Sequence, residues 1–387
     1  MLSEVNRESC TGCGACANVC SYDAIQMRSD EKTGFLYPSI DNEICVHCGR
    51  CAEICPVIAV SDKKISYESF MEESEKKNAY CALSNDEETR FNSTSGGLFT
   101  EFAKAILKKD GEVYGAGYDD NMIVRHFGIN DEKDICKLRR SKYVQSDTGL
   151  CFREIEEKLK RGISVLFVGC PCQTSGLRAY LGKDYDNLFL VEFVCLGVNS
   201  PLVFKNWIDE IETENNKKVT DVWFKYKKEG WRKSPFCTRV DFSDATNRVY
   251  NIDDNDYMKG YLFGSYFLRD SCSQCRFVGF NRKSDIIFGD YWNSSVGQAA
   301  GASFAIINSD KGQKLFDRIK GNIKWQKITI NSIYDCNPRL LTPVSKNELS
   351  DQFFDDMHKH GFGKAIRKLL AEHREQSEII MKILNEQ

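Results

Sequence analysis

Apolar and polar positions alternate along the chain in short periods that predict a mixed α/β architecture. Residues 164–169 and 188–196 are apolar runs of strand length, and apolar residues over 98–107 recur at helical spacing. That helix should end near Gly111. Strand and helix signals alternate from residue 79 onward, which indicates a sheet covered by helices. The other expected elements are strands at 79–83, 112–118, 124–129, 222–226, 237–242 and 248–252, the last three antiparallel, and helices at 148–161 and 174–181.

The same pattern divides the chain into a head, a core and a tail. The segment before residue 79 is charged and poor in apolar side chains, so we expect a linker or a solvated helix there. A chain of 387 residues is long enough for two or three domains. The expected boundaries are a head at 1–60, a linker at 61–78, a first core part at 79–165, a second core part at 166–345 and a charged, helical tail at 346–387.

Charge and composition exclude two classes of partner. The net charge is −3 and no run of basic residues occurs, so nucleic acid is not an expected partner. No apolar run approaches the roughly 18 residues that a membrane span requires, so no span is expected. The first nine residues are polar and charged, unlike a signal peptide, which favours a reducing, cytoplasmic location.

Eight of the 18 cysteines lie within the first 55 residues, as two copies of one spacing. Each copy has three cysteines separated by two residues and a fourth after three more, and Pro56 follows the second copy. This spacing is typical of two-cluster ferredoxins, in which the fourth cysteine of each run binds the other cluster. Gly12, Gly14 and Gly49 suit the tight loops around such clusters. The predicted ligands of the two 4Fe-4S clusters are Cys10, Cys13, Cys16 and Cys55 for one, and Cys45, Cys48, Cys51 and Cys20 for the other.

Other interpretations of the head are weaker. Disulfides would require an oxidising compartment, and zinc sites use paired C-x2-C knuckles rather than runs of three cysteines. His47 lies between two predicted ligands, and we expect it to pack or to tune the potential rather than to bind iron. Oxygen-labile clusters also suggest an anaerobic organism.

A second group of cysteines lies in the core. Cys272 and Cys275 form a C-x2-C pair, while Cys172 and Cys195 each follow a predicted buried strand, where ligands collect in α/β sheets. Spacing alone leaves open a third cluster, a zinc site, a redox dithiol or unrelated buried thiols, and Cys170 competes with Cys172 as a ligand. The remaining cysteines are expected to be small buried hydrophobes: Cys81, Cys136, Cys151, Cys237 and Cys336.

Three loops suit a phosphate-bearing cofactor. Iron-sulfur clusters carry single electrons, so a two-electron organic substrate requires an intermediary, usually a flavin. Residues 93–97 (Ser-Thr-Ser-Gly-Gly) precede a helix, residues 141–145 carry a lysine, and residues 169–173 lead from a strand into a helix. Each loop is also compatible with an ordinary helix cap or turn. The chain has neither a GxGxxG nor a GxxxxGK[ST] motif, so a Rossmann site or P-loop is not expected.

Taken together, these motifs resemble the beta subunits of coenzyme F-420-reducing hydrogenases and dehydrogenases. The resemblance covers most of the chain. It rests on the ferredoxin head, residues 93–97, Ser141-Lys-Tyr143, Pro171-Cys172-Gln173, Cys195-Leu-Gly197, Cys272-Ser-Gln-Cys275 and residues 285–292. It implies a core that holds FAD and a third 4Fe-4S cluster, bound by Cys172, Cys195, Cys272 and Cys275. The family usually has a threonine where this chain has Cys170. The cofactor-binding residues that it implies are Ser95, Gly96, Gly97, Ser141, Lys142, Tyr143, Gln173 and Asp290.

The expected fold is therefore a ferredoxin head followed by a mixed-sheet, flavin-binding α+β or α/β core. The resemblance implies an FAD-dependent and 4Fe-4S-dependent oxidoreductase that exchanges electrons with a soluble ferredoxin or a partner redox subunit. Its small-molecule substrate, coenzyme F-420 or another compound, and the direction of electron flow are left open, and no catalytic residue is assigned. The alternative is an electron-transfer adaptor without a substrate, for which the tail after Asp351 could provide the contact.

Several charged or aromatic residues near these motifs have two interpretations. Asp290 and Trp292 could line a substrate pocket, or serve as a cap beside a core tryptophan. Lys142 could contact a phosphate or be solvated. Four basic residues flank the C-x2-C pair and could bind an anion, but surface charge is the safer interpretation for Arg269, Arg276, Arg282 and Lys283.

Overall fold

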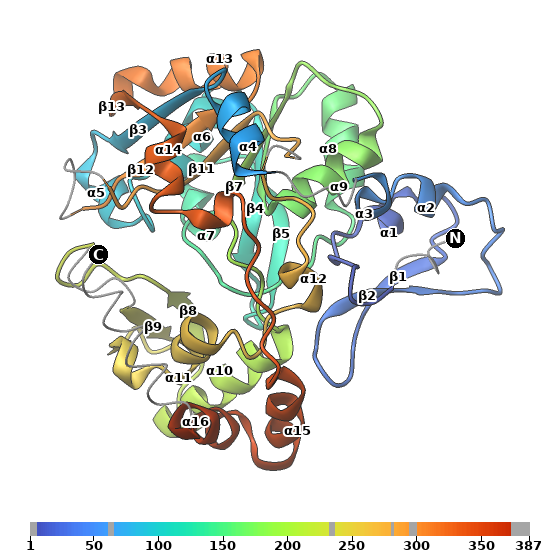
Figure 1. Cartoon of the computed structure of the whole chain (residues 1–387), viewed down its shortest axis with the longest axis vertical. Coiled ribbons are helices and arrows are strands. Elements are labelled where there is room, and N and C mark those ends of the chain that lie inside the picture. The colour runs from blue at the N-terminus through green and yellow to red at the C-terminus, as the bar shows by residue number, and fades with distance from the viewer. Residues whose placement is uncertain (1–5, 61–65, 232–236, 280–281, 294–299, 373–387) are drawn as a thin grey trace.

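The computed structural model describes residues 6–60, 66–231, 237–279, 282–293 and 300–372. In Figure 1 the N-terminal head protrudes on one side of a large mixed sheet, and a smaller sheet with the C-terminal helices lies below it. The expected α/β architecture with a ferredoxin-like head is confirmed.

The head consists of a β-hairpin and three short helices around the cysteine runs. Gly14 and Gly49 adopt left-handed conformations directly before α1 and α2, as the tight loops require. Strands β1 and β2 pair antiparallel, with Ile25 opposite Ile40. The bounds are α1 Ala15–Val19, β1 Ile25–Ser29, β2 Leu36–Ile40, α2 Arg50–Glu53 and α3 Pro56–Ala59.

An eight-stranded sheet forms the centre of the molecule, in the order β13-β3-β12-β11-β7-β6-β4-β5. Its four middle strands, β11, β7, β6 and β4, are parallel, and the outer pairs are antiparallel. The carboxyl ends of the parallel strands therefore meet at one edge, where loops can assemble a site. The bounds are β3 Asn78–Ser84, β4 Glu112–Tyr118, β5 Val124–Ile129, β6 Val165–Gly169, β7 Leu188–Phe193, β11 Ile286–Asp290, β12 Ser303–Ile307 and β13 Ile323–Ile328.

Helices cover both faces of this sheet. Because successive strand residues point to opposite faces, Leu166 packs in one apolar cluster with α6 and α13, whereas Val165 and Phe167 pack in another with α8 and α9. Helix α9 begins with Pro171 at its first turn and ends at left-handed Gly182. The bounds are α4 Tyr67–Ser74, α5 Glu87–Phe91, α6 Leu98–Leu107, α7 Ile135–Leu138, α8 Cys151–Lys160, α9 Pro171–Leu181, α13 Asp310–Ile319 and α14 Ile330–Tyr334.

A three-stranded antiparallel sheet, β10-β9-β8, packs with the C-terminal helices around a second aromatic core. Trp207 stacks on Tyr257 within it, Phe204 meets Tyr257 edge to face, and Phe353 of the tail joins them through Phe267. The bounds are α10 Pro201–Asn215, β8 Val219–Trp223, β9 Thr238–Phe242, β10 Asn247–Tyr250, α11 Asp256–Lys259, α12 Asp270–Ser273, α15 Ser350–His360 and α16 Phe362–Glu372.

Two regions described only loosely by the sequence now have defined roles. Within the expected linker, α4 is a helix whose Phe70 is fully buried, so the segment is not merely solvated. In the described part of the tail, up to residue 372, the helices bury Phe353, Ile366 and Leu369 against this chain, so these side chains are not available for a partner. Residues 373–387 of the expected tail lie outside the described residues.

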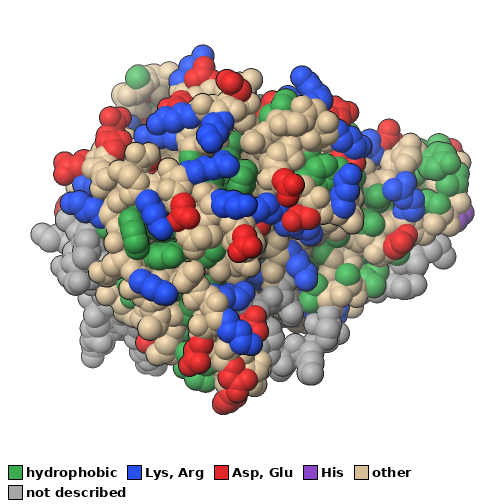
Figure 2. Space-filling view, turned by 90° about the horizontal axis from the view of Figure 1, so that it is seen from above, with side chains coloured by type: hydrophobic (Ala, Val, Ile, Leu, Met, Phe, Trp, Pro, Cys, Tyr) green, Lys and Arg blue, Asp and Glu red, His purple; other side chains and the backbone are tan. Residues whose placement is uncertain are grey.

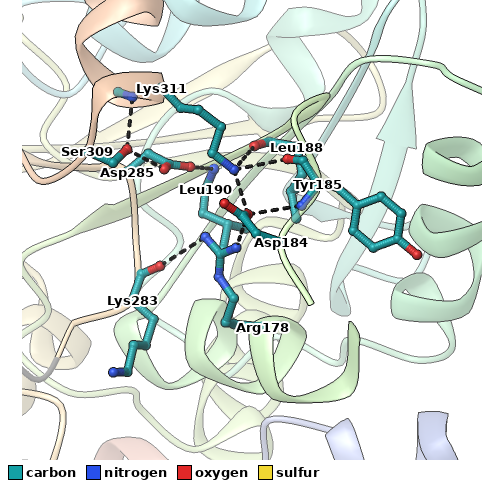
Figure 3. A network of polar contacts seen from close by, with 10 residues as sticks. Arg178, Asp184, Tyr185, Leu188, Leu190, Lys283, Asp285, Ser309 and Lys311 are labelled. Atoms are coloured by element: carbon teal, nitrogen blue, oxygen red, sulfur yellow. Dashed lines mark hydrogen bonds and ion pairs between the residues drawn. The ribbon is translucent and has the colours of Figure 1, made fainter. Parts of the chain in front are cut away.

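A polar network ties together the amino-terminal edge of the large sheet, opposite the carboxyl edge (Figure 3). Lys311 pairs with Asp184 and donates to the carbonyls of Tyr185 and Leu188, at 2.6, 3.0 and 3.2 Å. Asp285 accepts from the Leu190 N–H at 2.8 Å. These contacts fix the strand starts and leave the opposite edge for function.

The described part of the chain contains no helix long and apolar enough to span a bilayer. Figure 2 shows apolar side chains gathered at the tip of the head, while acidic and basic side chains are interspersed over the large-sheet region.

Candidate metal centres

The first group of thiols, which we call the inner site, consists of Cys10, Cys13, Cys16 and Cys55. These four lie close enough for their thiolates to repel one another electrostatically, and burial raises the pKa of the Cys13 thiol to about 12. Bare thiols here therefore prefer to stay protonated, and bound iron would be needed to hold them as thiolates. The structure thus brings together the four cysteines predicted to share one cluster.

The second group, the outer site, lies farther from the core and nearer to solvent. Cys51 interacts electrostatically with Cys48 and Cys20, and Cys48 is exposed. Cys45 belongs to the same loop, with its Sγ 4.0 Å from Nδ1 of His47. The crossed assignment of Cys20 to this group and of Cys55 to the inner site is compatible with these neighbours.

Five thiols, rather than four, meet at the carboxyl edge of the large sheet. We call this group the core site: Cys170 and Cys172 at the start of α9, Cys195 after β7, and Cys272 and Cys275 in and after α12. Cys172 interacts electrostatically with Cys195, Cys272 and Cys275, and Cys170 lies with its Sγ 3.9 Å from that of Cys195. The ligand set remains a prediction, with Cys170 as the fifth thiol.

The thiols of the core site differ in acidity. The hydrogen bond between the Cys195 and Cys170 thiols, the one from the Gly197 N–H and the Arg282 charge lower the pKa of Cys195. Burial raises the pKa of Cys272 to about 12 and of Cys275 to about 11. Cys195 is therefore the thiol best prepared to bind iron as a thiolate.

The inner and core sites are neighbours. Cys55, Cys172 and Cys275 share one apolar cluster with Phe277, which is 1% exposed. A Cβ on Gly176 of α9 would lie only 3.1 Å from the Sγ of Cys13, so the head packs directly onto the helix that carries Cys172. The buried Phe277 therefore packs against thiols of both groups.

These groups are not spaced for single ions. Within the described residues, no three Cys, His, Asp or Glu side chains are placed to surround one metal ion. The thiolates of a cubane each bind a different iron, so they do not require single-ion spacing. The free thiols and the left-handed Gly12, Gly14 and Gly49 fit 4Fe-4S clusters in the head.

Two arginines that the sequence suggested were surface charges are buried. Arg269 is 1% exposed and donates to the carbonyl of Cys10 at 2.8 Å. Arg282 forms a buried ion pair with Glu192, with 2.9 Å between Nη1 and Oε1. Arg276 is half-buried and donates to the Val57 carbonyl, whereas Lys283 is exposed. Sequence spacing contained no signal for the burial, because their partners lie far away in the chain.

Of the isolated cysteines, Cys81, Cys151 and Cys237 are buried as expected. Cys136 is exposed, so the prediction of a buried hydrophobe was wrong there. Cys336 is partly buried.

The Ser-Gly-Gly loop packs tightly against the chain itself. Ser95 donates to the carbonyl of Ala302, and the Gly96 N–H donates to Ser303 Oγ at 2.9 Å. A Cβ on Gly96 would lie 2.6 Å from the Ala82 carbonyl oxygen. Gly97 caps α6 in a left-handed conformation. These glycines therefore allow the loop to pack closely against strands β3 and β12 of the chain itself.

Lys142 and Gln173 also have partners within the chain. Lys142 is buried, and its Nζ donates to the carbonyls of Lys137, Arg139 and Arg140 at the end of α7. Gln173 accepts from the Cys170 N–H and donates to Ser146, both at 2.9 Å. Their assignment to FAD stays a prediction.

The other predicted FAD residues gather around a lysine that the sequence did not single out. Lys225 pairs with Asp290, with 2.6 Å between Nζ and Oδ2, and hydrogen-bonds to the partly buried Tyr143. Tyr143 is also hydrogen-bonded to Ser141. Lys225 lies over the ring of Trp292, at 5.2 Å from its centroid. Lys225 is one of three lysines that follow β8 and carried no sequence signal of its own, because folding alone brings it to Asp290.

This cluster adjoins the core site. Trp292 stacks on Trp231 at 4.1 Å, and Trp231 donates to the carbonyl of Thr94 in the Ser-Gly-Gly loop. Thr94 in turn accepts from the Ser141 N–H at 3.1 Å. Tyr261 packs 5.3 Å from Tyr143 and interacts electrostatically with Cys195 and Cys272. Two of the three predicted cofactor loops therefore meet beside the core site.

A ferredoxin-like head on a mixed α/β core with thiols at its carboxyl edge defines an iron-sulfur protein class. Comparison with family models specifies it further: residues 9–59 match the 4Fe-4S dicluster domain. Residues 163–331 match the family model for the C terminus of the coenzyme F420 hydrogenase/dehydrogenase beta subunit. The chain thus has a head similar to dicluster domains and a region similar to the C terminus of that beta subunit, which confirms the resemblance inferred from the motifs.

Comparisons with whole proteins gave a distant likeness. No curated protein matches the chain. A chain from the F420-reducing [NiFe] hydrogenase complex of Methanosarcina barkeri is 17% identical, with a TM-score of 0.43. The match covers 76% of this chain and 91% of that one.

Proposed function

We propose that this chain is an iron-sulfur flavoprotein oxidoreductase. It would pass electrons between its head and a two-electron substrate, coenzyme F-420 or another small organic molecule, in a reducing compartment such as the cytoplasm. When bound, the clusters would supply one-electron transfer and FAD would couple it to a two-electron reaction. The observation that carries the proposal is the shared cluster of Cys55, Cys172, Cys275 and Phe277, which joins the inner and core sites.

Different residues of the chain have different roles at the outer, inner and core sites. The outer site meets solvent through the exposed Cys48, and the buried Phe277 packs against thiols of the inner and core sites. Beyond the core site, Lys225 pairs with Asp290 and hydrogen-bonds to Tyr143. Predicted FAD residues from separate segments meet at this lysine, so we place the flavin and substrate beside it.

The head offers a surface for an electron partner, a soluble ferredoxin or a partner redox subunit. Tyr22, Ile44 and Val46 are 57%, 47% and 52% exposed and lie next to the outer-site cysteines Cys20 and Cys45. Exposed apolar side chains of this size are typical of transient contacts. The same surface would serve an adaptor without a substrate, so flavin content distinguishes the two functions.

The test is anaerobic reconstitution followed by measurement of iron, sulfide and flavin. Three cubanes predict about twelve irons per chain, with one FAD, at four irons per cluster. About eight irons per chain would show that the core site does not hold a cluster. Absence of flavin, together with failure to take up FAD, would make the adaptor the better function.

Two variants, each with one cysteine replaced, test the core site directly. Cys275→Ala should lower the iron content by about four atoms per chain, the content of one cubane. Cys136→Ala is the matched control, because Cys136 is exposed and lies outside all three sites. Equal iron in the two variants would contradict the assignment of Cys275.

A further inference from the structure

We propose that Arg269 is a positioning residue that keeps the buried inner site reducible, so that electrons can pass inward from the exposed outer site. The inference rests on the proposed function, in that the head must hold both clusters. It is based on a difference in charge between the surroundings of the inner site and those of the outer site, although the two sites come from copies of one cysteine motif.

Arg269 reaches from the core into the head. Its guanidinium donates to the carbonyl of Cys10 at 2.8 Å, to the carbonyl of Leu36 at 3.0 Å and to Oε1 of Gln145 at 3.2 Å. It also lies 4.2 Å from the ring centroid of Tyr37. All three hydrogen-bond acceptors are neutral oxygens, and among the described residues Arg269 forms no ion pair.

The head is shaped to admit this side chain. Gly12 has a φ of +67°, and a Cβ there would lie 3.1 Å from Nη1 of Arg269 and 2.3 Å from Nε2 of Gln145. The neighbouring Asp270 is paired with Lys346 at 3.1 Å. A full positive charge is thus buried beside the loop that carries three of the inner-site cysteines.

The outer site has a comparable arginine whose charge is compensated. Arg153 donates to the carbonyl of Cys20 at 2.6 Å and to that of Asn18 at 2.7 Å. Its Nη1 pairs with Asp23 at 2.8 Å, and its side chain is 29% exposed. Solvent and a carboxylate therefore screen Arg153, whereas Arg269 is buried and no carboxylate of the described chain pairs with it.

The core site is likewise balanced, because Arg282 beside Cys195 is paired with the buried Glu192. Of these three arginines, only Arg269 is buried without a carboxylate partner in the described chain. It donates to the inner-site loop, and its charge also acts on Cys272 of the core site. This asymmetry matters because reduction adds negative charge to a cluster. Burial alone disfavours that charge, and a nearby cation in a medium of low dielectric offsets the cost.

The expected consequence is a shift in the reduction potential of the inner cluster that the outer cluster does not share. Replacing Arg269 by glutamine should lower the potential of the inner cluster so that its ratio of reduced to oxidised form falls at least tenfold at a fixed solution potential. A tenfold change corresponds to about 59 mV for a one-electron couple. Arg269→Lys keeps the charge and should retain most of the potential, although it loses the fork of donors.

The experiment is an anaerobic redox titration of the reconstituted full chain, followed by electron paramagnetic resonance. Cys48→Ser identifies the outer-site signal, because Cys48 belongs to that site alone. Arg153→Gln is the matched control, since it removes an arginine bonded to a ligand carbonyl at the outer site. It should shift the outer potential much less than Arg269→Gln shifts the inner one.

Each outcome decides the matter. Equal shifts in Arg269→Gln and Arg269→Lys would reduce the residue to a structural role, and an unchanged inner potential in both would overturn the proposal. An outer-site shift of the same size in Arg153→Gln would remove the asymmetry. If the unaltered protein showed only one of the two paramagnetic resonance signals expected from the head clusters, the proposed function itself would be contradicted. Iron content, measured on every variant, separates loss of a cluster from a change in its potential.

Discussion

His126 is a buried, neutral residue whose protonation should couple stability to pH. Its ring stacks on Phe167 at 5.3 Å, and its Nε2 lies 3.2 Å from the carbonyl oxygen of Val168. Burial is the main cause that lowers its pKa to about 4 from the ordinary 6.5. Between these values the unfolded chain binds more protons than the folded one, so stability falls as pH falls from 6.5 toward 4.

At pH 5 this linkage lowers the free energy of unfolding by about 2 kcal/mol, because the pKa of His126 is about 4 in the folded chain and 6.5 in the unfolded chain. His126→Gln should therefore flatten the dependence of the urea midpoint on pH between 7.5 and 5. His360→Gln, which alters an exposed histidine of α15, should leave that dependence unchanged. Parallel profiles for the unaltered protein and His126→Gln would contradict the assignment.

At the scale of elements, the head hairpin is locked onto the start of α10 through a glycine. Gly34, in the turn between β1 and β2, has a φ of +73°, and a Cβ there would lie 2.3 Å from the Cβ of Leu202 and 2.7 Å from its N. Ser200, the cap of α10, donates to the carbonyl of Thr33 in the same turn. No side chain can enter this contact without separating hairpin and helix.

Gly34→Ala should therefore destabilise the protein through both backbone strain and the clash with Leu202. Gly182→Ala is the matched control, because Gly182 has a φ of +64° but a Cβ added to it would meet nothing within 4 Å. Strain alone should cost the control about 1–2 kcal/mol. Thermal melting and urea unfolding of the two variants compare them. If the Gly34→Ala variant were as stable as the Gly182→Ala variant, the hairpin would be able to move away from α10 without cost.

The elements that the sequence predicted well are those with local signals. The helix at 98–107 and the strands at 112–118 and 124–129 have the predicted bounds, because their periodicity and end signals lie within each segment. Strands β12 and β13 were not predicted. Strand β12 is fully buried, and β13 is an edge strand with four successive exposed residues, so neither shows clean alternation.

The candidate sites divide in the same way. The head cysteines could be predicted from spacing, since three of the four predicted ligands of each cluster come from one run of sequence. By contrast, Lys225, Asp290 and Tyr143 come from three separate segments, and their meeting depends on how the small sheet packs against the large one. Arg269 and Cys10 are likewise 259 positions apart. A single sequence contains no signal for such pairs, because pairing across a fold is not a local property.

At the scale of the whole molecule, the tail holds the head in place from the opposite end of the chain. Lys32, in the head turn, pairs with Asp355 at 2.9 Å and with Asp351 at 3.3 Å on α15, and His358 Nε2 lies 2.8 Å from the Lys32 carbonyl oxygen. These exposed contacts are individually weak. Their alignment depends on α15 itself, which is anchored by the fully buried Phe353.

Removing that anchor should loosen a segment more than 300 residues away in sequence. Phe353 packs 5.3 Å from Phe267 and 6.4 Å from Phe362, and Phe→Ala changes in such cores cost about 3–5 kcal/mol. Phe353→Ala should therefore speed amide exchange in α15 and in the head turn at 30–34, because the contacts of Lys32 require an ordered helix. Exchange in the outer-site loop should stay unchanged. Gln352→Ala, an exposed neighbour on the same helix, is the control, and equal exchange in both variants would show that the head turn holds its place without the tail.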